Sequence, residues 1–349
     1  MGENKLRAAI LGLEGKGQLL VKAASQVDYF QIQAVADRDA SVAQKLAAEY
    51  GCAAYDDYRR LVIQNQLDCL LVAAGMHACD EHIRAAMRKK FNVLKLAPGG
   101  RNFEEAVGFV RLAEEERIKF AIGNPYRFAG CFCAFRRFLQ EGGLEQPFLI
   151  VASCEMGGEV YPAWRSDPKL AGGGVLLYDC YQIIDQLMWS FSIPQQIYSL
   201  NSSQAADKQQ RLYLTEDTSL VTMKFTDTLT GSIAAFRRAG AGVRRESVAV
   251  YGRDKIVTVD GSRFAVSDSV GRTIEQAEYD NDELGCMKKM LEDFALSILK
   301  PAEHRLCSSG RENLKDMAVI EAAYLSGRTS LPEEPVRVLQ MVQLEAGDV

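Results

Sequence analysis

Hydrophobic and polar positions along the first third of the chain form short apolar runs that alternate with amphipathic stretches. An apolar run bounded by polar residues predicts a buried strand, and apolar residues at helical spacing predict a helix. The predicted strands are 6–12, 30–36, 69–73, 91–96 and 118–122. The predicted helices are 18–25, 40–50, 80–90 and 103–116. Strands alternating with helices indicate βαβ units, so we expect an α/β fold with a doubly wound parallel sheet.

After Asn124-Pro125 the pattern changes to one helix followed by many short strands. The predicted elements are a helix at 128–138, strands at 148–155, 197–201, 219–225, 231–237, 246–251, 255–260 and 263–267, and two closing helices, the second at 312–328. Strands separated by turns every few residues are typical of an antiparallel sheet. We therefore expect two domains, an α/β domain at 1–124 and an α+β domain at 125–349.

Composition narrows the functional classes. The net charge of −5 provides no basic field for nucleic acid or for an anionic membrane surface. No apolar run is long enough to span a membrane, and the first residues lack the apolar core of a signal peptide, so we expect a cytoplasmic protein. Nine scattered cysteines are typical of reduced thiols, and three histidines supply a zinc or iron site poorly, so no metal is expected.

The segment 12–17, Gly-Leu-Glu-Gly-Lys-Gly, lies where a dinucleotide-binding turn is expected, between the first strand and the first helix. Gly12 and Gly17 occupy the first and third glycine positions of G-x-G-x-x-G. Glu14 occupies the second, where its carboxylate opposes phosphate charge. Gly15 and Lys16 are the candidates that compensate for it, since a lysine at a helix N-terminus favours an anion. The structural alternative is a glycine-rich turn that binds nothing.

An acidic residue follows this turn at the spacing of the same motif. Asp37 ends the second predicted strand about twenty residues after Gly17, where a carboxylate accepts both ribose hydroxyls of an adenosine. Asp37 favours NAD over NADP because it repels a 2′-phosphate. Arg38 leaves NADP open, since a guanidinium pairs with that phosphate.

Several motifs in order along nearly the whole chain resemble the Gfo/Idh/MocA family of sugar and cyclitol oxidoreductases. They are the turn at Gly12, Ala34-Val35-Ala36-Asp37, Pro98 followed by Phe103-Glu104-Glu105-Ala106, Arg127-Phe128, Trp164-Arg165, Gly172-Gly173-Gly174, Glu216-Asp217-Thr218 and Ala323-Tyr324-Leu325-Ser326. The resemblance implies a Rossmann domain followed by a large, open antiparallel sheet. It also implies a carbohydrate-like substrate, a nicotinamide cofactor and a homo-oligomer formed through the open sheet.

The chain departs from this family at the motifs that carry its chemistry. Where the family has Glu-Lys-Pro, this chain has Leu96-Ala97-Pro98, so the lysine is absent. The family's Asp-x-x-x-His corresponds to Tyr178 and Gln182, and glutamine cannot shuttle a proton as imidazole does. The loop beside the nicotinamide is Ala74-Gly75-Met76. Ala74 and Pro98 remain candidate cofactor contacts.

Lys95 and Tyr178 are the candidates for replacing the missing groups. Lys95 lies two residues before Ala97 and therefore on the same face of the predicted strand. Tyr178, Tyr181, Gln182 and Asp185 are spaced so that they form one polar stripe on a helix. We expect this stripe to line the cleft, with Tyr178 relaying a proton and a nearby Lys95 ammonium lowering its pKa. The structural alternative is a hydrogen-bonded tyrosine and a lysine in a surface ion pair.

Other charged and aromatic residues match family positions around the expected cleft. Arg127, Trp164 and Arg165 are candidate substrate contacts, together with Tyr181 and Asp185 from the stripe, and a structural ion pair is the alternative for the arginines. The histidines at 77 and 82 match no family catalytic position and are expected to be surface or helix-cap groups.

Three functions remain open from the sequence. The first is an NAD(P)-dependent oxidoreductase acting on a sugar, sugar acid or cyclitol. The second is a non-catalytic binding subunit that has kept the fold but lost hydride transfer, as the changes at positions 14, 97 and 182 suggest. The third is glycoside cleavage through transient oxidation of the sugar by retained NAD. No partner other than a small molecule and further copies of the chain is expected.

Overall fold

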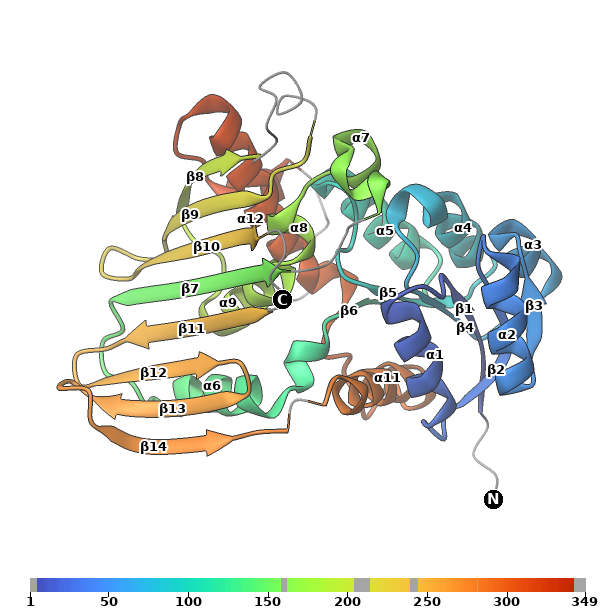
Figure 1. Cartoon of the computed structure of the whole chain (residues 1–349), viewed down its shortest axis with the longest axis horizontal. Helices are drawn as coiled ribbons and strands as arrows, with labels where there is room; N and C mark the ends of the chain where they lie inside the picture. Colours follow the sequence, from blue (N-terminus) through green and yellow to red (C-terminus); the bar gives the residue numbers. More distant parts are fainter. Residues whose placement is uncertain (1–4, 158–161, 204–213, 239–243, 281, 342–349) are drawn as a thin grey trace. The chain divides into compact units, whose positions relative to one another are not determined.

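The chain separates into two compact units, each with its own sheet (Figure 1). The computed structural model describes residues 5–157, 162–203, 214–238, 244–280 and 282–341. The first unit comprises residues 1–100, 104–128 and 282–313, and the second comprises residues 101–103, 129–281 and 314–349. Among the described helices, none is both long and apolar enough to cross a membrane.

The first unit is built on a six-stranded parallel sheet in the order β3-β2-β1-β4-β5-β6. Its strands are β1 Leu6–Leu11, β2 Phe30–Ala36, β3 Ala53–Tyr55, β4 Cys69–Val72, β5 Asn92–Leu96 and β6 Phe120–Gly123. Its helices are α1 Lys16–Ser25, α2 Ala40–Tyr50, α3 Tyr58–Gln64, α4 Met76–Arg88, α5 Phe103–Glu115, η1 Pro125–Phe128 and α11 Glu283–Leu299. The predicted doubly wound parallel sheet is confirmed.

Two small elements of this unit, β3 and α3, are not among the predicted ones. β3 has only three residues, and none of them is buried. The helix α3 begins at the cap Asp57, whose carboxylate accepts the backbone N–H of Arg59 at 2.7 Å, and it extends for seven residues only. Elements this short give little periodicity from which to predict them.

The helix α11 packs in the first unit although it follows the second sheet in sequence. Its apolar stripe of Met287, Met290, Leu291 and Phe294 is buried in the same core as Leu20 of α1. A division of the chain at 124/125 assigns this helix to the second domain, whereas the structure places it in the first. The apolar spacing of α11 indicated that it has a buried face, but it did not indicate which core receives that face.

The second unit contains an eight-stranded sheet in the order β14-β13-β12-β11-β7-β10-β9-β8. Its strands are β7 Leu149–Gly157, β8 Gln196–Ser202, β9 Thr218–Lys224, β10 Thr230–Arg238, β11 Arg245–Tyr251, β12 Lys255–Asp260, β13 Arg263–Asp268 and β14 Thr273–Glu278. The pairing is antiparallel except between β7 and β10, which run parallel with Ile150 opposite Gly231. The predicted large sheet is therefore confirmed, with one parallel pair that the sequence did not indicate.

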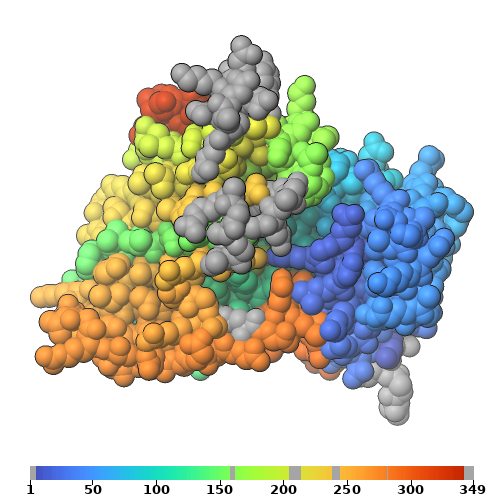
Figure 2. Space-filling view, in the orientation of Figure 1, coloured from blue at the N-terminus to red at the C-terminus, as the bar shows by residue number. Residues whose placement is uncertain are grey.

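Alternate side chains divide this sheet into a buried face and an open face. The helices of the unit are α6 Gly130–Gln140, η2 Ala163–Ser166, α7 Pro168–Ala171, α8 Val175–Tyr178, α9 Tyr181–Phe191, α12 Gly310–Thr329 and α13 Pro335–Gln340. The first residues of α12, 310–313, belong to the first unit. Ile150, Val221 and Val248 point into the core, whereas Val151 and Leu220 on the opposite face are 40% and 51% exposed. No described helix crosses the open face along β7, β11 and β12 (Figures 1 and 2).

Candidate active site

The turn between β1 and α1 is packed too closely for any side chain at its first or last glycine. Gly12 has a φ of +81°, and a Cβ at this position would overlap the backbone nitrogen of Ala74. A Cβ at Gly17 would overlap the carbonyl oxygen of Gly12. Ala74 lies directly after β4 and donates its N–H to the carbonyl of Leu11 at 3.1 Å. The ends of β1 and β4 and the start of α1 are thus held together by close backbone contact.

Asp37 ties this turn to the end of β2. Its carboxylate is 5% exposed and accepts the backbone N–H of Leu13 at 2.6 Å through Oδ2 and that of Asp39 at 3.0 Å through Oδ1. A carboxylate offers about four lone-pair directions, so two are used in these bonds. The spacing predicted a carboxylate beside the turn. It did not predict that the carboxylate also fixes the turn itself.

The outer part of the turn is open. Glu14 is exposed, and a Cβ at Gly15, whose φ is +52°, would meet nothing within 4 Å. The Lys16 ammonium lies 3.9 Å from the carboxylate of Glu283, and both side chains are about half exposed. The start of α1 has no side-chain cap and no acidic residue in its first turn. Such a helix N-terminus is suited to an anion, so the residues present fit a dinucleotide diphosphate over this turn.

A ring pair lies near Asp37. Tyr58 at the start of α3 contacts His82 of α4 edge-on, with ring centroids 5.9 Å apart. Burial raises the pKa of Tyr58, and the charge of Asp37 raises it further. His82 is half-buried against this ring, whereas a surface or helix-cap group was expected from the sequence, and its burial lowers its pKa. Arg38 is exposed beside Asp37, as a contact to a coenzyme 2′-phosphate requires.

Lys95 is buried in β5 rather than exposed at the end of the strand. Its side chain is 4% exposed, and Nζ donates to the carbonyl of Leu96 at 2.6 Å. Burial lowers the pKa of Lys95, while the nearby Cys79 and Glu105 act in the opposite direction. Ala97 and the buried Pro98 follow directly after the strand. The surface ion pair considered for this lysine is therefore wrong, because the strand is covered on both faces.

A Lys95→Met variant tests why a lysine is retained at this buried position. We expect its unfolding free energy at pH 7 to be unchanged or up to about 2 kcal/mol higher, since an apolar side chain of similar volume replaces a desolvated ammonium. At pH values between the lowered pKa of Lys95 in the folded wild type and its ordinary pKa of 10.5, this lysine is protonated in the unfolded chain and largely neutral in the folded one. The unfolded state therefore binds more protons, and the unfolding free energy rises with pH across that range. Urea unfolding at several pH values should show this rise in the wild type and its loss in the variant.

The exposed Lys45 on α2 provides the control, because Lys45→Met should leave the pH dependence intact. A Lys95→Met variant that loses more than about 2 kcal/mol would mean that the bond to Leu96 holds the fold, which contradicts this expectation.

Arg127 lies in the first unit, where its buried guanidinium forms an ion pair with Glu312. Its side chain is 1% exposed, NH1 lies 3.2 Å from the carboxylate of Glu312, and it donates to the carbonyl of Cys307. These contacts correspond to the structural alternative considered for this arginine. Burial raises the pKa of the Cys307 thiol to about 11, while the guanidinium acts against that rise.

In the second unit Tyr178 is enclosed by two of the residues expected beside it. The Trp164 ring contacts the Tyr178 ring edge-on at 5.7 Å, and the Arg165 guanidinium lies over the same ring at 4.5 Å. The Tyr178 hydroxyl donates to the carbonyl of Ala171 at 2.8 Å. Trp164, Arg165 and Tyr178 therefore form one cluster, although η2 and α8 are separate elements.

The polar stripe expected on one helix is divided between two. Tyr178 ends the short helix α8, and α9 begins at Tyr181 after a break at 179–180. Tyr181, Gln182 and Asp185 lie on α9 and are 0%, 7% and 0% exposed. The prediction of one continuous cleft-lining stripe is therefore wrong. Gly174 is the N-terminal cap of α8, which ends after one turn at Tyr178.

The break between these helices contains a carboxylate that the sequence argument did not select. Asp179 is 6% exposed, and its Oδ1 lies 3.1 Å from the Arg165 guanidinium. No hydrogen bond from the described residues reaches its Oδ2. A buried carboxylate oxygen without a donor is unusual, and it is suited to accept a hydroxyl from a ligand. The signal in the sequence was an acid directly after Tyr178, one position away from the family pattern.

Three motifs that are far apart in sequence form the cap of α8. The Glu216 carboxylate accepts the N–H of Gly174 at 2.8 Å, the N–H of Leu176 at 3.1 Å and the hydroxyl of Tyr324 at 2.8 Å. A Cβ at Gly173 would overlap the Tyr324 hydroxyl. Burial raises the pKa of Glu216. The glycine triplet, Glu216 and Tyr324 therefore fix the helix that ends in Tyr178.

The predicted site residues thus form two groups, one in each unit. The turn at Gly12, Asp37, Ala74 and Lys95 belong to the first unit, and the cluster around Tyr178 belongs to the second. Gln182 and Asp185 are buried on α9.

Comparison with known proteins assigns a family model to each part of the chain. Residues 6–124 match the model described as "Oxidoreductase family, NAD-binding Rossmann fold". Residues 132–258 match the "GFO/IDH/MocA C-terminal domain". Together the two matches cover well over half of the chain.

Two curated relatives and one solved structure illustrate the similarity. The rhizopine catabolism protein MocA of Rhizobium meliloti is 25% identical over 185 residues, 53% of this chain and 57% of the relative. D-xylose 1-dehydrogenase (NADP(+)) 2 of Haloferax volcanii is 28% identical over 206 residues, 54% of this chain and 58% of the relative. The matches thus span somewhat more than half of each relative.

The solved structure is an oxidoreductase from Agrobacterium radiobacter, described in complex with NAD+, L-tartaric acid and magnesium. It has a TM-score of 0.83 at 16% identity and covers 96% of this chain and 100% of its own. At this identity the likeness shows a shared fold.

Proposed function

The chain belongs to the Gfo/Idh/MocA oxidoreductase family, with the family's NAD-binding Rossmann domain first, and from this premise we propose that it is an NAD(P)-dependent oxidoreductase of a sugar, sugar acid or cyclitol. The observation that carries the proposal is the open turn at Gly12–Gly17 with the Asp37 carboxylate beside it. The xylose dehydrogenase among the relatives and the tartrate-bound structure support a polyhydroxylated substrate.

The first unit holds the proposed coenzyme. The N-terminus of α1 and the Gly15 backbone receive the diphosphate, and the remaining lone pairs of Asp37 accept ribose hydroxyls. Lys16 supplies positive charge, and Ala74 and Pro98 bound the nicotinamide side. Glu14 is exposed, so its side chain is not packed into the turn. When bound, NAD supplies the hydride acceptor.

The second unit contributes the proposed acid–base group. Tyr178 moves a proton at its phenolic oxygen, with Lys95 as the other member of the relay. A lysine whose pKa is lowered by burial exchanges protons closer to neutral pH than an exposed one does. Arg165 and Trp164 orient the tyrosine ring, and Arg165 offers donors to substrate hydroxyls or carboxylates. Gln182 takes the family's histidine position and provides an amide in place of an imidazole.

We also propose that the open face of the second sheet pairs with a second copy of the chain. Four apolar side chains on this face are 36% to 58% exposed, namely Val151, Tyr198, Leu200 and Leu220. Apolar side chains gathered on one face are typical of an interface.

A second function, a binding subunit without hydride transfer, is favoured by the partners of the two relay groups. The Tyr178 hydroxyl already donates to Ala171, and the Lys95 ammonium already donates to Leu96. In this alternative the fold binds coenzyme or sugar but turns over neither. Glycoside cleavage through transient oxidation requires the same coenzyme and is distinguished by its product.

The proposal is tested with the purified chain by titrating the fluorescence of NADH and NADPH and then assaying NAD+ reduction with D-xylose, myo-inositol and D-gluconate. We expect saturable binding of NADH, at least about 10-fold tighter than NADPH, because the Asp37 carboxylate repels a 2′-phosphate. Growth of the reduced-nicotinamide absorbance with one of the polyols supports the oxidoreductase. Binding without turnover on this class of substrate supports the subunit. Failure to bind either coenzyme contradicts the oxidoreductase and leaves the subunit as a sugar-binding protein.

A further inference from the structure

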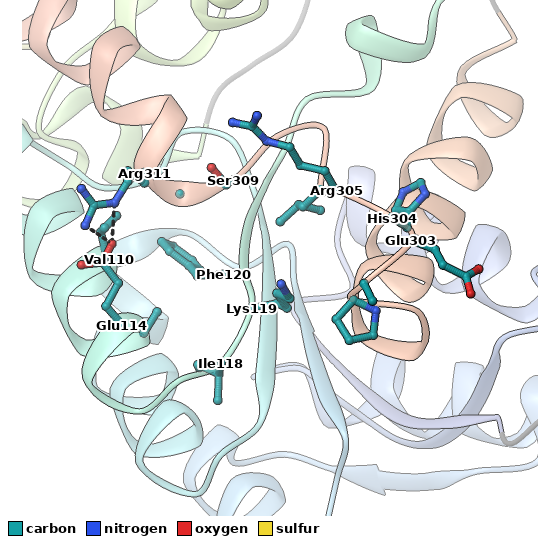
Figure 3. Close-up of a pocket in the computed structure, with 15 residues that line it drawn as sticks. Val110, Glu114, Ile118, Lys119, Phe120, Glu303, His304, Arg305, Ser309 and Arg311 are labelled. Atoms are coloured by element: carbon teal, nitrogen blue, oxygen red, sulfur yellow. Dashed lines mark hydrogen bonds and ion pairs between the residues drawn. The ribbon is translucent and has the colours of Figure 1, made fainter. Parts of the chain in front are cut away.

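A pocket of about 440 Å³ lies in the first unit at the amino end of β6 (Figure 3). Its walls come from the end of α5, the residues 118–120 that lead into β6, the segment 301–306 after α11, and the start of α12 at 309–311. We call it the β6 pocket. None of these residues belongs to the turn at Gly12, to Asp37 or to the Tyr178 cluster.

The β6 pocket lies at the amino ends of the strands of the parallel sheet, and the coenzyme turn lies at their carboxyl ends. Phe120 is the first residue of β6, whereas Gly12 directly follows the last residue of β1. Because all strands of this sheet run parallel, their first residues lie together at one end of the sheet and their last residues at the other. A ligand in the β6 pocket is therefore separate from a dinucleotide over the turn.

Two cations of the pocket have no counter-ion in the described part of the chain. Arg311 is neutralised by Glu114 at 2.6 Å, and His304 is bonded to Asp293 at 2.8 Å. Lys119 and Arg305 form no such ion pair or side-chain hydrogen bond with described residues, and Lys119 is half-buried. Figure 3 shows the exposed Glu303 carboxylate directed away from both. The pocket therefore presents two positive charges that are not compensated locally.

The floor below these charges is apolar and closely packed. The Phe120 ring is 7% exposed and contacts the Phe109 ring at 6.0 Å. A Cβ at Gly310 would overlap this ring, so glycine allows the start of α12 to pack directly against Phe120. Ile118 and Leu306 complete the floor. An apolar floor below fixed charges favours a ligand with an apolar body and an anionic end.

Hydrogen bonds to β6 hold the wall of the pocket in place. Ser308 Oγ donates to the carbonyl of Ile122 at 2.7 Å, and the N–H of Ile122 donates to the carbonyl of Ser308 at 3.1 Å. Asn313 Nδ2 donates to Ser308 Oγ at 2.9 Å. The segment that carries Arg305 is therefore anchored to the sheet, and less ordering is required when a ligand binds.

We propose that the β6 pocket is a binding site for a small organic anion, whose phosphate or carboxylate is attracted by the uncompensated charges of Lys119 and Arg305 and whose apolar or aromatic body lies against Phe120 and Ile118. The site is independent of the coenzyme turn and of the proposed acid–base group.

Isothermal titration calorimetry with phenyl phosphate tests this site in the full chain. We expect saturable binding with one site per chain that weakens at least about 10-fold in the Lys119→Gln, Arg305→Gln double variant, because both uncompensated positive charges of the pocket are removed. Inorganic phosphate and phenol, each carrying one half of the probe, should bind at least about 10-fold more weakly than phenyl phosphate.

The matched control is a Lys45→Gln, Arg253→Gln double variant, which removes the same charge from exposed positions outside the pocket. It should bind phenyl phosphate as the wild type does. Equal affinity in the pocket variant overturns the proposal, as does equal affinity for inorganic phosphate and phenyl phosphate. Binding that NADH abolishes while the pocket variant retains it belongs to the coenzyme turn and also overturns the proposal.

Discussion

Replacing Tyr178 with phenylalanine is expected to lower kcat by about 10²- to 10⁴-fold, the usual contribution of a positioned acid–base group. The phenyl ring retains the contacts with Trp164 and Arg165, so NADH affinity should stay within about 2-fold of the wild type. The bond from the hydroxyl to Ala171 is lost, which costs about 1 kcal/mol of unfolding free energy. Steady-state kinetics, an NADH titration and urea unfolding measure the three quantities separately.

The matched control is Tyr251→Phe, the same chemical change on β11 of the same unit, which should leave kcat unchanged. A Tyr178→Phe variant with full turnover removes the acid–base role from this residue. If Asp179→Asn then abolishes turnover, the role passes to the carboxylate whose Oδ2 receives no hydrogen bond from the described residues. If neither variant lowers kcat, the chain still turns over its substrate, so the binding-subunit alternative is not supported, and a group other than Tyr178 or Asp179 must transfer the proton.

A Gly12→Ala variant is expected to lose about 3–5 kcal/mol of unfolding free energy and nearly all coenzyme affinity. The added Cβ overlaps the backbone of Ala74, and backbone cannot move aside as a flexible side chain does. The positive φ adds about 1–2 kcal/mol of strain for any residue other than glycine. Urea unfolding measures the first loss, and NADH fluorescence measures the second.

Two other glycines with positive φ separate these effects. In Gly15→Ala and Gly51→Ala the added Cβ meets nothing within 4 Å, so only backbone strain is added. Gly51 lies in the left-handed region, with φ 66° and ψ 38°, and its variant should lose about 1–2 kcal/mol. Gly15 lies outside that region, with φ 52° and ψ −115°, and its variant should lose about 1–3 kcal/mol. Gly15→Ala should also weaken NADH binding at least about 10-fold, because its methyl group enters the space proposed for the diphosphate. Gly51→Ala, at the end of α2, should not. Equal NADH affinity in both variants would contradict a diphosphate over the turn.

The parallel sheet could be predicted from the sequence because its strands are continuous apolar runs. Leu70, Leu71 and Val72 of β4 are fully buried on both faces, which is the pattern that predicted them. The position of α11 could not be predicted, because an apolar stripe does not specify its partner. The parallel pairing of β7 with β10 depends on a long connection between them, which local periodicity does not describe.

The site was predictable as far as local spacing determined it. The glycines at 12 and 17 and the acid at 37 follow from a motif with fixed offsets. Burial of Lys95 and of Arg127 depends on which helices cover β5 and β6, so residue type alone did not distinguish a site cation from a structural one. The start of α8 depends on Glu216, which is distant in sequence from the helix that it caps.

The cap of α8 also constrains how related sequences can diverge. Gly173 leaves room for the Tyr324 hydroxyl, and that hydroxyl donates to Glu216. A side chain at position 173 is therefore tolerated only with a shorter residue at 324, and the carboxylate at 216 then loses a donor. We therefore expect positions 173, 216 and 324 to vary together among related sequences. The tyrosine at 324 is then retained because it supports the helix that presents Tyr178.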